Sequence, residues 1–184
     1  MMWKGTEDMT ITLSLGLLIL RLVAGLTLAA HGAQKLGWFG GASFPKTVQV
    51  MQKQGFKPAW LWASLTILGE VGGGLSLAFG FLTPLGAAGA VGTMFMAIVK
   101  AHWKHGFWNR DHGLEFPLQL LASSLAIGLV GPGNYALDAL FGIVLPEALL
   151  FGVLTVAALL VDVIGLLISR PAAVVQTEVR SPSS

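Results

Sequence analysis

Residues 11–33 read ITLSLGLLILRLVAGLTLAAHGA, an apolar run that contains one residue with a permanent charge, Arg21. A helix needs about 20 predominantly apolar residues to cross the hydrocarbon of a bilayer. A charge near the middle of such a helix costs at least about 2.5–3.5 kcal/mol on insertion scales, so Arg21 should face the interior of a bundle. This stretch therefore predicts a transmembrane helix with a polar interaction inside the membrane.

The overall composition also indicates a membrane protein. The 184 residues are 54% hydrophobic and 11% charged, whereas roughly 25% of the residues in a soluble domain are charged. The net charge of +2 is too small to suggest nucleic acid, so the expected surroundings are a lipid bilayer. The absence of cysteine excludes disulfides, thiolate metal sites and Fe–S ligation by this chain itself.

The pattern predicts an all-α fold, a polytopic membrane helix bundle with a four-helix core and a fifth transmembrane helix. The expected helices are residues 11–33, 60–82, 85–102, 115–131 and 146–168. Thr83-Pro84 should form a tight turn that makes the second and third helices an antiparallel hairpin. We divide the chain into an N-terminal segment (1–10), a membrane domain (11–140), an additional transmembrane helix (141–169) and a disordered tail (170–184).

The distribution of lysine and arginine predicts the orientation in the membrane. One side of the predicted bundle receives Lys4 alone. The other receives Lys35, Lys46, Lys53, Lys57, Lys100, Lys104, Arg110, Arg170 and Arg180. Because cytoplasmic loops are enriched in basic residues, we expect the amino terminus outside and the carboxyl terminus in the cytoplasm.

Glu70 is the acidic counterpart of Arg21 in the second apolar run. Counted from the ends of their runs, both charges lie about 15 Å from the same side, which predicts an ion pair between them. The pair could hold the helices in register, or it could serve as a proton relay or as an anchor for an anionic or quinone-like ligand. Gly72-Gly73-Gly74 should admit another helix close to Glu70, so Arg21, Glu70 and Gly73 form a candidate quinone site.

Further polar residues gather at the predicted cytoplasmic ends of the helices. His31 and Lys35 are four residues apart and share one side of a helix, so they can either address one site or anchor the helix in the headgroups. Glu115 begins the fourth helix, where a carboxylate is favoured by the helix dipole. It could also be the acidic partner of Lys35 or a proton acceptor. We therefore take Arg21, Glu70, His31, Lys35 and Glu115 as candidate catalytic residues.

Two other features have weaker functional interpretations. His102 and His105 are three residues apart, but no carboxylate or thiolate stands beside them at a helix-compatible spacing. We expect them to anchor the helix end at the interface and predict no metal site. Asp162 lies deep in the fifth run, and the sequence does not indicate a partner for it.

Ordered motifs along residues 11–140 resemble the DoxX family of small bacterial and archaeal membrane proteins. These motifs are RLVAG (21–25), HGAQKL (31–36), GEVGGG (69–74), GFLTP (80–84), GLE (113–115) and GPGNYALD (131–138). The resemblance implies a four-helix protein of the cell (inner) membrane. It also implies association with redox enzymes, because some relatives are subunits of a thiosulfate:quinone oxidoreductase and others assemble with soluble redox enzymes. The fifth apolar run departs from this pattern.

Three functions are consistent with these residues. The first is a subunit of a quinone-dependent oxidoreductase. Quinone is the one cofactor expected for it. Its expected partners are other redox subunits or soluble redox enzymes that dock at the cytoplasmic face. The second is a non-catalytic scaffold whose loops dock soluble thiol or oxidative-stress enzymes. A small transporter ranks third, because the sequence has no inverted repeat of broken helices.

Overall fold

The computed structural model describes residues 4–169, and all the regular structure in that range is helical. The major helices are α1 (Lys4–Gln34), α2 (Phe44–Lys53), α3 (Ala59–Ile67), α4 (Gly73–Phe79), α5 (Thr83–Ala97), α6 (Glu115–Val130), α7 (Leu137–Leu140) and α8 (Glu147–Ile168). Short helical turns complete the chain: η1 (Trp38–Gly40), η2 (Leu68–Gly72), η3 (Ile98–His102), η4 (Trp103–His105) and η5 (Asn109–Asp111). The predicted all-α bundle is confirmed, whereas the predicted tail, 170–184, lies outside the described residues.

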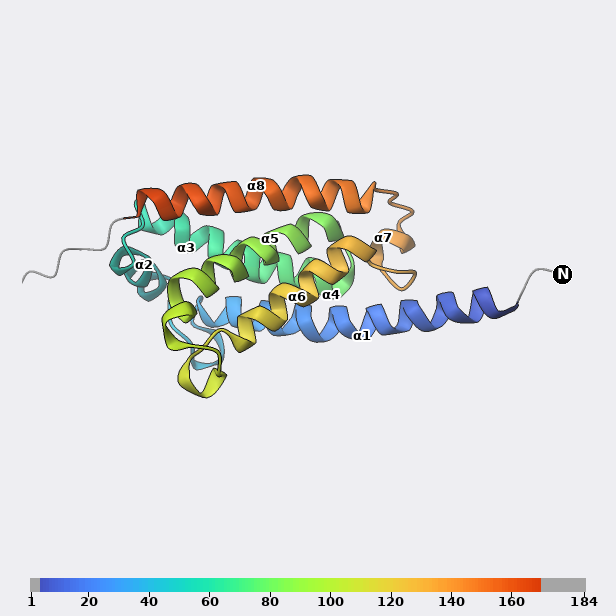
Figure 1. The fold of residues 1–184 in the computed structure, drawn as a ribbon, viewed down its shortest axis with the longest axis horizontal. Coiled ribbons are helices and arrows are strands. Elements are labelled where there is room, and N and C mark those ends of the chain that lie inside the picture. The colour runs from blue at the N-terminus through green and yellow to red at the C-terminus, as the bar shows by residue number, and fades with distance from the viewer. Residues whose placement is uncertain (1–3, 170–184) are drawn as a thin grey trace, which may run out of the picture.

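Within residues 4–169, four helical stretches are long and apolar enough to cross a membrane. They are Thr10–Gln34, Ala59–Phe79, Thr83–His105 and Glu147–Ile168. The helix expected at 115–131 is present as α6, but its 16 residues span only about 24 Å, less than the roughly 30 Å hydrocarbon thickness. In Figure 1, α1 and α8 form opposite faces of the bundle, with α3–α6 between them.

Helix α1 is longer than the sequence suggested. It begins at Lys4, within the expected N-terminal segment, whereas its apolar, membrane-spanning part begins at Thr10. No proline interrupts residues 4–10, and the helix continues without a break to Gln34. Its first turns project beyond the other helices in Figure 1.

The predicted hairpin between the second and third spanning stretches is present, but its turn lies at residues 80–82, and Thr83-Pro84 begin α5 instead of forming the turn. Gly80 and Leu82 both adopt left-handed backbone conformations, with φ of 63° and 48°, and α5 starts at Thr83. A left-handed conformation is unfavourable for leucine because its Cβ crowds the following carbonyl. The turn therefore depends on contacts from elsewhere in the chain.

Glycines bring α1 and α5 against opposite sides of α4. A Cβ on Gly25 of α1 would lie 2.5 Å from both Ala78 N and Gly74 O. On the other side, a Cβ on Gly73 would lie 2.9 Å from Gly86 O of α5. The small residues around Glu70 thus admit neighbouring backbones, as the sequence predicted.

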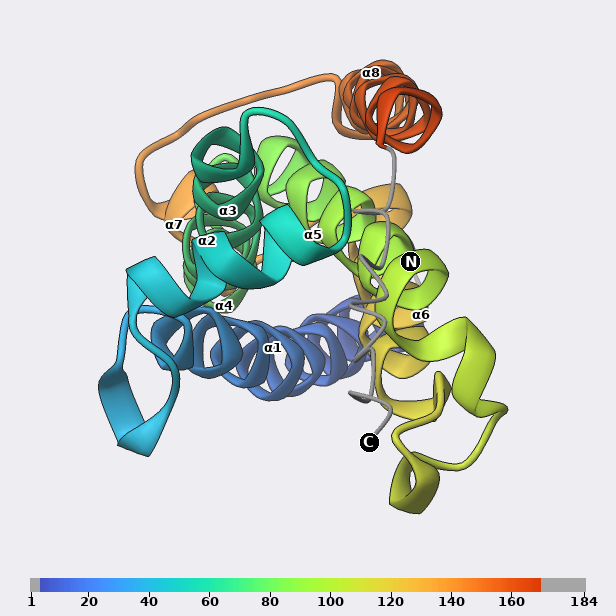
Figure 2. The same cartoon turned by 90° about the vertical axis from the view of Figure 1, so that its left-hand side faces the viewer.

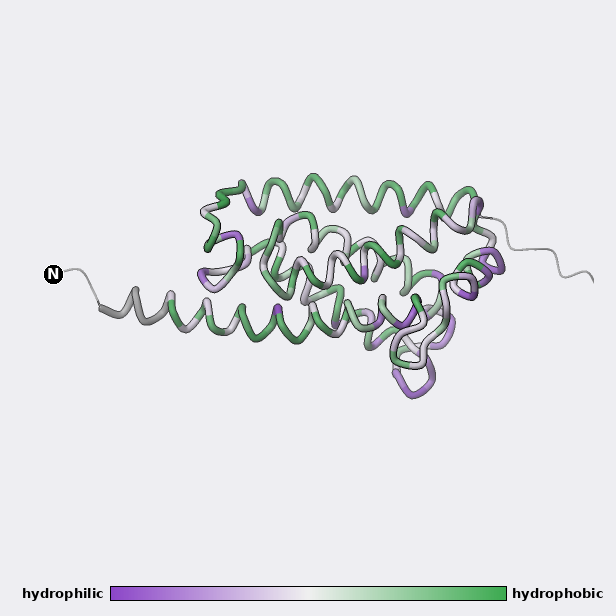
Figure 3. The backbone as a smooth tube through the Cα atoms, turned by 180° about the vertical axis from the view of Figure 1, so that it is seen from behind, coloured by the Kyte–Doolittle hydropathy of each residue, from purple (hydrophilic) through white to green (hydrophobic). Residues whose placement is uncertain are grey.

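The two ends of the bundle differ in polarity. Figure 3 shows hydrophilic loops gathered at the end where α1 finishes and α3 begins, which we call the basic end. The end that carries the 80–83 turn is called the hairpin end. Figure 2 is viewed from the basic end and shows α2 lying across the first turns of α3. Met51 of α2 packs there with Phe56 and Trp62 in a small cluster.

Replacing Gly25 with alanine should loosen α1, because the added methyl group cannot fit against the backbone of α4. We expect the free energy of unfolding in detergent to fall by about 1–3 kcal/mol. Gly16→Ala is the matched control, since nothing lies within 4 Å of a Cβ at that position of the same helix. Equal stability of the two variants would contradict the packing described here.

Candidate functional site

Arg21 is completely buried and belongs to the hairpin end. Its Nη2 donates a hydrogen bond to the carbonyl oxygen of Tyr135, at 2.7 Å. Gly80 leaves room for the guanidinium, because a Cβ there would lie 1.7 Å from Nη1. Asp138 is the carboxylate with which Arg21 interacts electrostatically. Arg21 therefore joins α1 to the segment that follows α6.

The predicted ion pair between Arg21 and Glu70 is wrong. Gly25 contacts Ala78, and Gly32 contacts Glu70, so Glu70 lies level with a position eleven residues beyond Arg21, or about 16 Å along α1. Equal depths counted from the ends of the two apolar runs would place the charges together only if these ends were level. In the structure, α3 extends past the end of α1 toward the basic end, where α2 packs against it.

Asp138 clamps the hairpin turn. Its Oδ1 accepts a hydrogen bond from Leu82 N at 2.8 Å, and its Oδ2 accepts hydrogen bonds from Thr83 N and Thr83 Oγ1. These bonds hold Leu82 in its unfavourable conformation. The sequence analysis did not select Asp138, although the residue ends the GPGNYALD motif, which was the available signal.

Glu70 forms its ion pair with Lys35. The Lys35 ammonium donates a hydrogen bond to Glu70 Oε2; the Glu70 side chain is 4% exposed and that of Lys35 is 30% exposed. Glu70 sits in the π-helical turn η2, and such turns are frequent at functional sites. Lys35 directly follows α1, where Thr47 of α2 donates a hydrogen bond to the Lys35 carbonyl oxygen.

A polar cavity of about 290 Å³ opens beside this ion pair. Three of the predicted site residues, His31, Lys35 and Glu70, line it together, whereas Arg21 and Glu115 do not. Lys100 and His102 line it from the second π-helical turn, η3. The sequence placed His31, Lys35, Lys100 and His102 near one membrane face and Glu70 about 15 Å deeper. It could not show that two π-helical turns border one cavity.

The aromatic and cationic residues around the cavity are held by local contacts. The His31 ring lies 4.8 Å from the Phe116 ring, measured between centroids. Lys100 Nζ donates a hydrogen bond to Ser169 Oγ at 2.6 Å. His102 Nδ1 lies 2.7 Å from His112 O. These contacts position the side chains and leave the Lys35–Glu70 pair as the charged centre of the cavity.

Glu115 has a local role that differs from the predicted one. Its Oε2 accepts a hydrogen bond from Asn109 N at 3.0 Å, which ties the loop before α6 to the start of that helix. The prediction that Glu115 is the acidic partner of Lys35 is wrong, because Glu70 occupies that position. A proton-accepting role for Glu115 stays a prediction.

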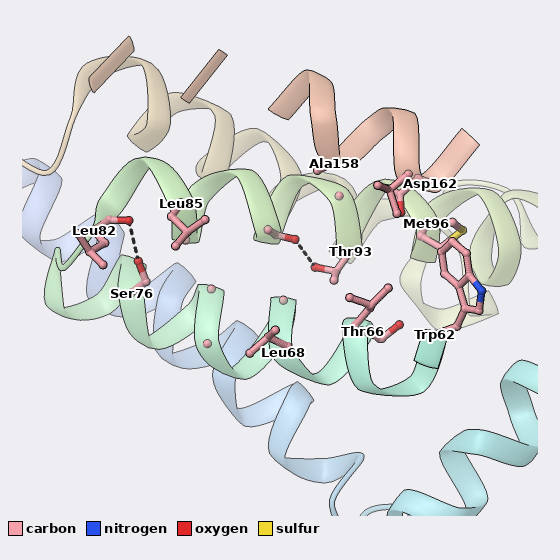
Figure 4. Close-up of a pocket in the computed structure, with 18 of the residues that line it drawn as sticks. Trp62, Thr66, Leu68, Ser76, Leu82, Leu85, Thr93, Met96, Ala158 and Asp162 are labelled. Carbon is pink, nitrogen blue, oxygen red and sulfur yellow. Dashed lines mark hydrogen bonds between the residues drawn. The ribbon is translucent and has the colours of Figure 1, made fainter. Parts of the chain in front are cut away.

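An apolar groove of about 490 Å³ lies between the α3–α4 stretch, α5 and α8 (Figure 4). Glycines form much of its surface: Gly69, Gly72, Gly73, Gly86, Gly89 and Gly92. The candidate residue Gly73 therefore lines this groove and not the cavity beside Glu70. Thr66, Thr93 and Met96 line both spaces, so the groove and the polar cavity share a wall.

Comparison with known proteins assigns the family. A family model described as DoxX matches residues 16–103, a range that contains Arg21, Lys35, Glu70 and both π-helical turns. The inner membrane protein YqjF of Escherichia coli (strain K12) is 31% identical over 127 residues, which cover 68% of this chain and 91% of YqjF. The chain belongs to the DoxX family.

The DoxX assignment confirms the predicted resemblance and, with the apolar helices, a multi-pass membrane protein. No solved structure matches the chain. Asp138 and helix α8 lie beyond the residues that the DoxX model matches. The groove is therefore built partly by DoxX-matched helices and partly by a helix outside that match.

The two alternative pairings of Glu70 can be separated by double-mutant cycles in unfolding experiments. Lys35→Met and Glu70→Gln should show a coupling energy of about 0.5–3 kcal/mol, because the residues share an ion pair. Arg21→Lys and Glu70→Gln should be additive within about 0.3–0.5 kcal/mol. Coupling in the second cycle and none in the first would restore the pairing expected from the sequence.

Asp138→Ala should destabilise the hairpin end, because it removes the acceptor of three hydrogen bonds. We expect a loss of at least about 1–3 kcal/mol in the free energy of unfolding. Hydrogen exchange at the Leu82 and Thr83 amides should accelerate. Asp138→Asn keeps one acceptor oxygen and should lose less, and unchanged exchange in Asp138→Ala would argue against the clamp.

Proposed function

We propose that this DoxX protein is an inner-membrane subunit of a quinone-linked oxidoreductase. The observation that supports this most directly is the shared wall between two unlike spaces. One space is an apolar groove along the spanning helices, suited to a lipid-soluble molecule. The other is a polar cavity with a buried ion pair. A quinone needs both surroundings, because its ring and chain are apolar while its reduction consumes protons.

The polar cavity has groups that can handle protons. Glu70 is buried and bonded to Lys35, and His31 lies in the same cavity. Ionisable groups inside membranes commonly mark proton relays. Conversion of a quinone to a quinol requires two electrons and two protons; in this proposal the protons enter through the cavity, and a partner redox enzyme supplies the electrons.

The revised site differs from the one expected from the sequence. Glu70, His31 and Lys35 stay as candidates for proton transfer, and Gly73 stays as a candidate for quinone contact through the groove. Arg21 is assigned to its hydrogen bond with the Tyr135 carbonyl oxygen at the hairpin end and is left out of the quinone site.

The basic end is proposed to face the cytoplasm and to receive the partner enzyme. Lys46, Lys53 and Lys57 are exposed there, on α2 and on the segment that joins it to α3. Cytoplasmic loops are enriched in such residues. The same exposed lysines favour the second candidate function, a scaffold that docks soluble redox enzymes without itself binding quinone.

Two measurements on the same preparation test the proposal. Protein purified in mild detergent should yield an isoprenoid quinone on solvent extraction. In membrane vesicles, Glu70→Gln should lower quinone reduction by about 10²-fold or more while the quinone content is unchanged. Asp111→Asn, which alters an exposed carboxylate outside the cavity, should leave the rate unchanged.

The outcomes distinguish the two candidate functions. Absence of quinone, together with an unchanged rate for Glu70→Gln, would overturn the quinone-linked role. A soluble redox enzyme that co-purifies with a quinone-free protein, and is released by replacing Lys46, Lys53 and Lys57 with glutamine, would establish the scaffold instead.

A further inference from the structure

Asp162 is a buried carboxylic acid in the wall of the apolar groove. It belongs to α8, its residue exposure is 9%, and Figure 4 shows it between α8 and α5, near Met96. Among the described residues, 4–169, no group donates a hydrogen bond to its Oδ2. A buried carboxyl group without a partner costs free energy in an apolar environment. The groove thus contains one unsatisfied polar atom.

The groove offers Asp162 no basic partner. Its lining contains no lysine, arginine or histidine among the described residues, and its other polar side chains are Thr66, Thr93, Ser76 and the indole of Trp62. The Thr93 hydroxyl is already bonded to the carbonyl oxygens of Gly89 and Ala90. A molecule that enters the groove can therefore supply a hydrogen-bonding partner for Asp162.

We propose that the groove binds an uncharged amphiphile of the quinone–quinol type, with its oxygen-bearing ring hydrogen-bonded to Asp162. This rests on the proposed function and names the residue that recognises the ligand. A quinol hydroxyl can donate to the carboxylate, and a quinone carbonyl can accept from the protonated acid. Asp162 serves here in binding alone, and no electron or proton transfer is assigned to it.

The shape of the groove favours this ligand over a phospholipid. Trp62 closes its basic end by packing against Gly165, where a Cβ would lie 2.0 Å from the indole ring. Asp162 is six residues, or about 9 Å, before the end of α8, so the bound polar group lies inside the hydrocarbon. A charged phosphate at that depth, beside a carboxyl group, would be unfavourable.

The glycines provide a surface for the apolar chain. Gly92 lies beside Asp162, with a hypothetical Cβ 3.3 Å from Asp162 Oδ2. From Gly92 the groove passes Gly89 and Gly86 toward Leu85 near the hairpin end. A hydrocarbon chain can lie beside Gly89, where the nearest atom to a Cβ is 3.8 Å away, whereas Ser76 fills the space beside Gly86.

Gly89 is the groove-lining glycine of α5 at which a Cβ meets the fewest close neighbours. A Cβ there would meet only the Cα of Gly69, at 3.8 Å, which is an ordinary contact. Gly89→Leu therefore tests groove occupancy. Gly152→Leu is the matched control on a membrane helix, because nothing lies within 4 Å of a Cβ at that position and Gly152 does not line the groove.

The experiment measures binding of decylubiquinone and decylubiquinol to the full chain in nanodiscs. Asp162→Leu and Gly89→Leu should each raise the Kd of the preferred form at least about tenfold, the loss expected for one hydrogen bond to a buried or charged group or for a blocked chain site. Asp162→Asn, which keeps a donor and an acceptor, should bind within a few-fold of the wild type, as should Gly152→Leu.

Different failures have different meanings. If the wild type binds and the Asp162 and Gly89 variants bind equally well, the groove assignment is overturned while the quinone-linked function stands. If the wild type binds neither form, the proposed function fails, and this inference fails with it. Loss of a dimer in Gly89→Leu, without quinone binding by the wild type, would assign the groove to a second copy of the chain and overturn the proposal.

Discussion

The close contact between α1 and α4 is the constraint on which the rest of the structure depends. Gly25 and Gly74 let the two backbones meet, and this contact determines which residues of the two helices are level. In a membrane, helix association relies on packing and polar contacts because lipid is as apolar as leucine. The glycine contacts thus determine which residues of the neighbouring helices lie level with Arg21 and with Glu70.

The axial register between α1 and α4 separates the buried charges into two groups with different roles. Arg21 meets the 131–138 segment at the hairpin end, where Asp138 holds the strained turn before α5. Glu70 meets Lys35 near the basic end, beside a cavity. Because the first group is enclosed by contacts within the chain, we assign it to stability. The second group borders open space and is the better candidate for chemistry.

Helix α8 links the architecture to the proposed ligand. It packs against α5 and α6 and brings Asp162 to a groove whose other walls lie within the DoxX-matched residues. Most of its large side chains face outward, as expected of a helix in contact with lipid. The inward-facing carboxyl group of Asp162 distinguishes this groove from an apolar groove between packed helices that has no polar group.

The helices, the hairpin before α5 and the DoxX family could be predicted from the sequence, because hydrophobic run length, turn residues and ordered motifs are local properties. It also brought His31 and Lys35 to one helix end, since their spacing is four residues. The packed structure was needed to show that Glu70 pairs with Lys35, that Arg21 bonds to the Tyr135 carbonyl oxygen, and that Asp162 faces a groove. These pairings depend on the axial position of one helix relative to the next. That position is set by contacts between residues distant in the sequence, such as Gly32 with Glu70.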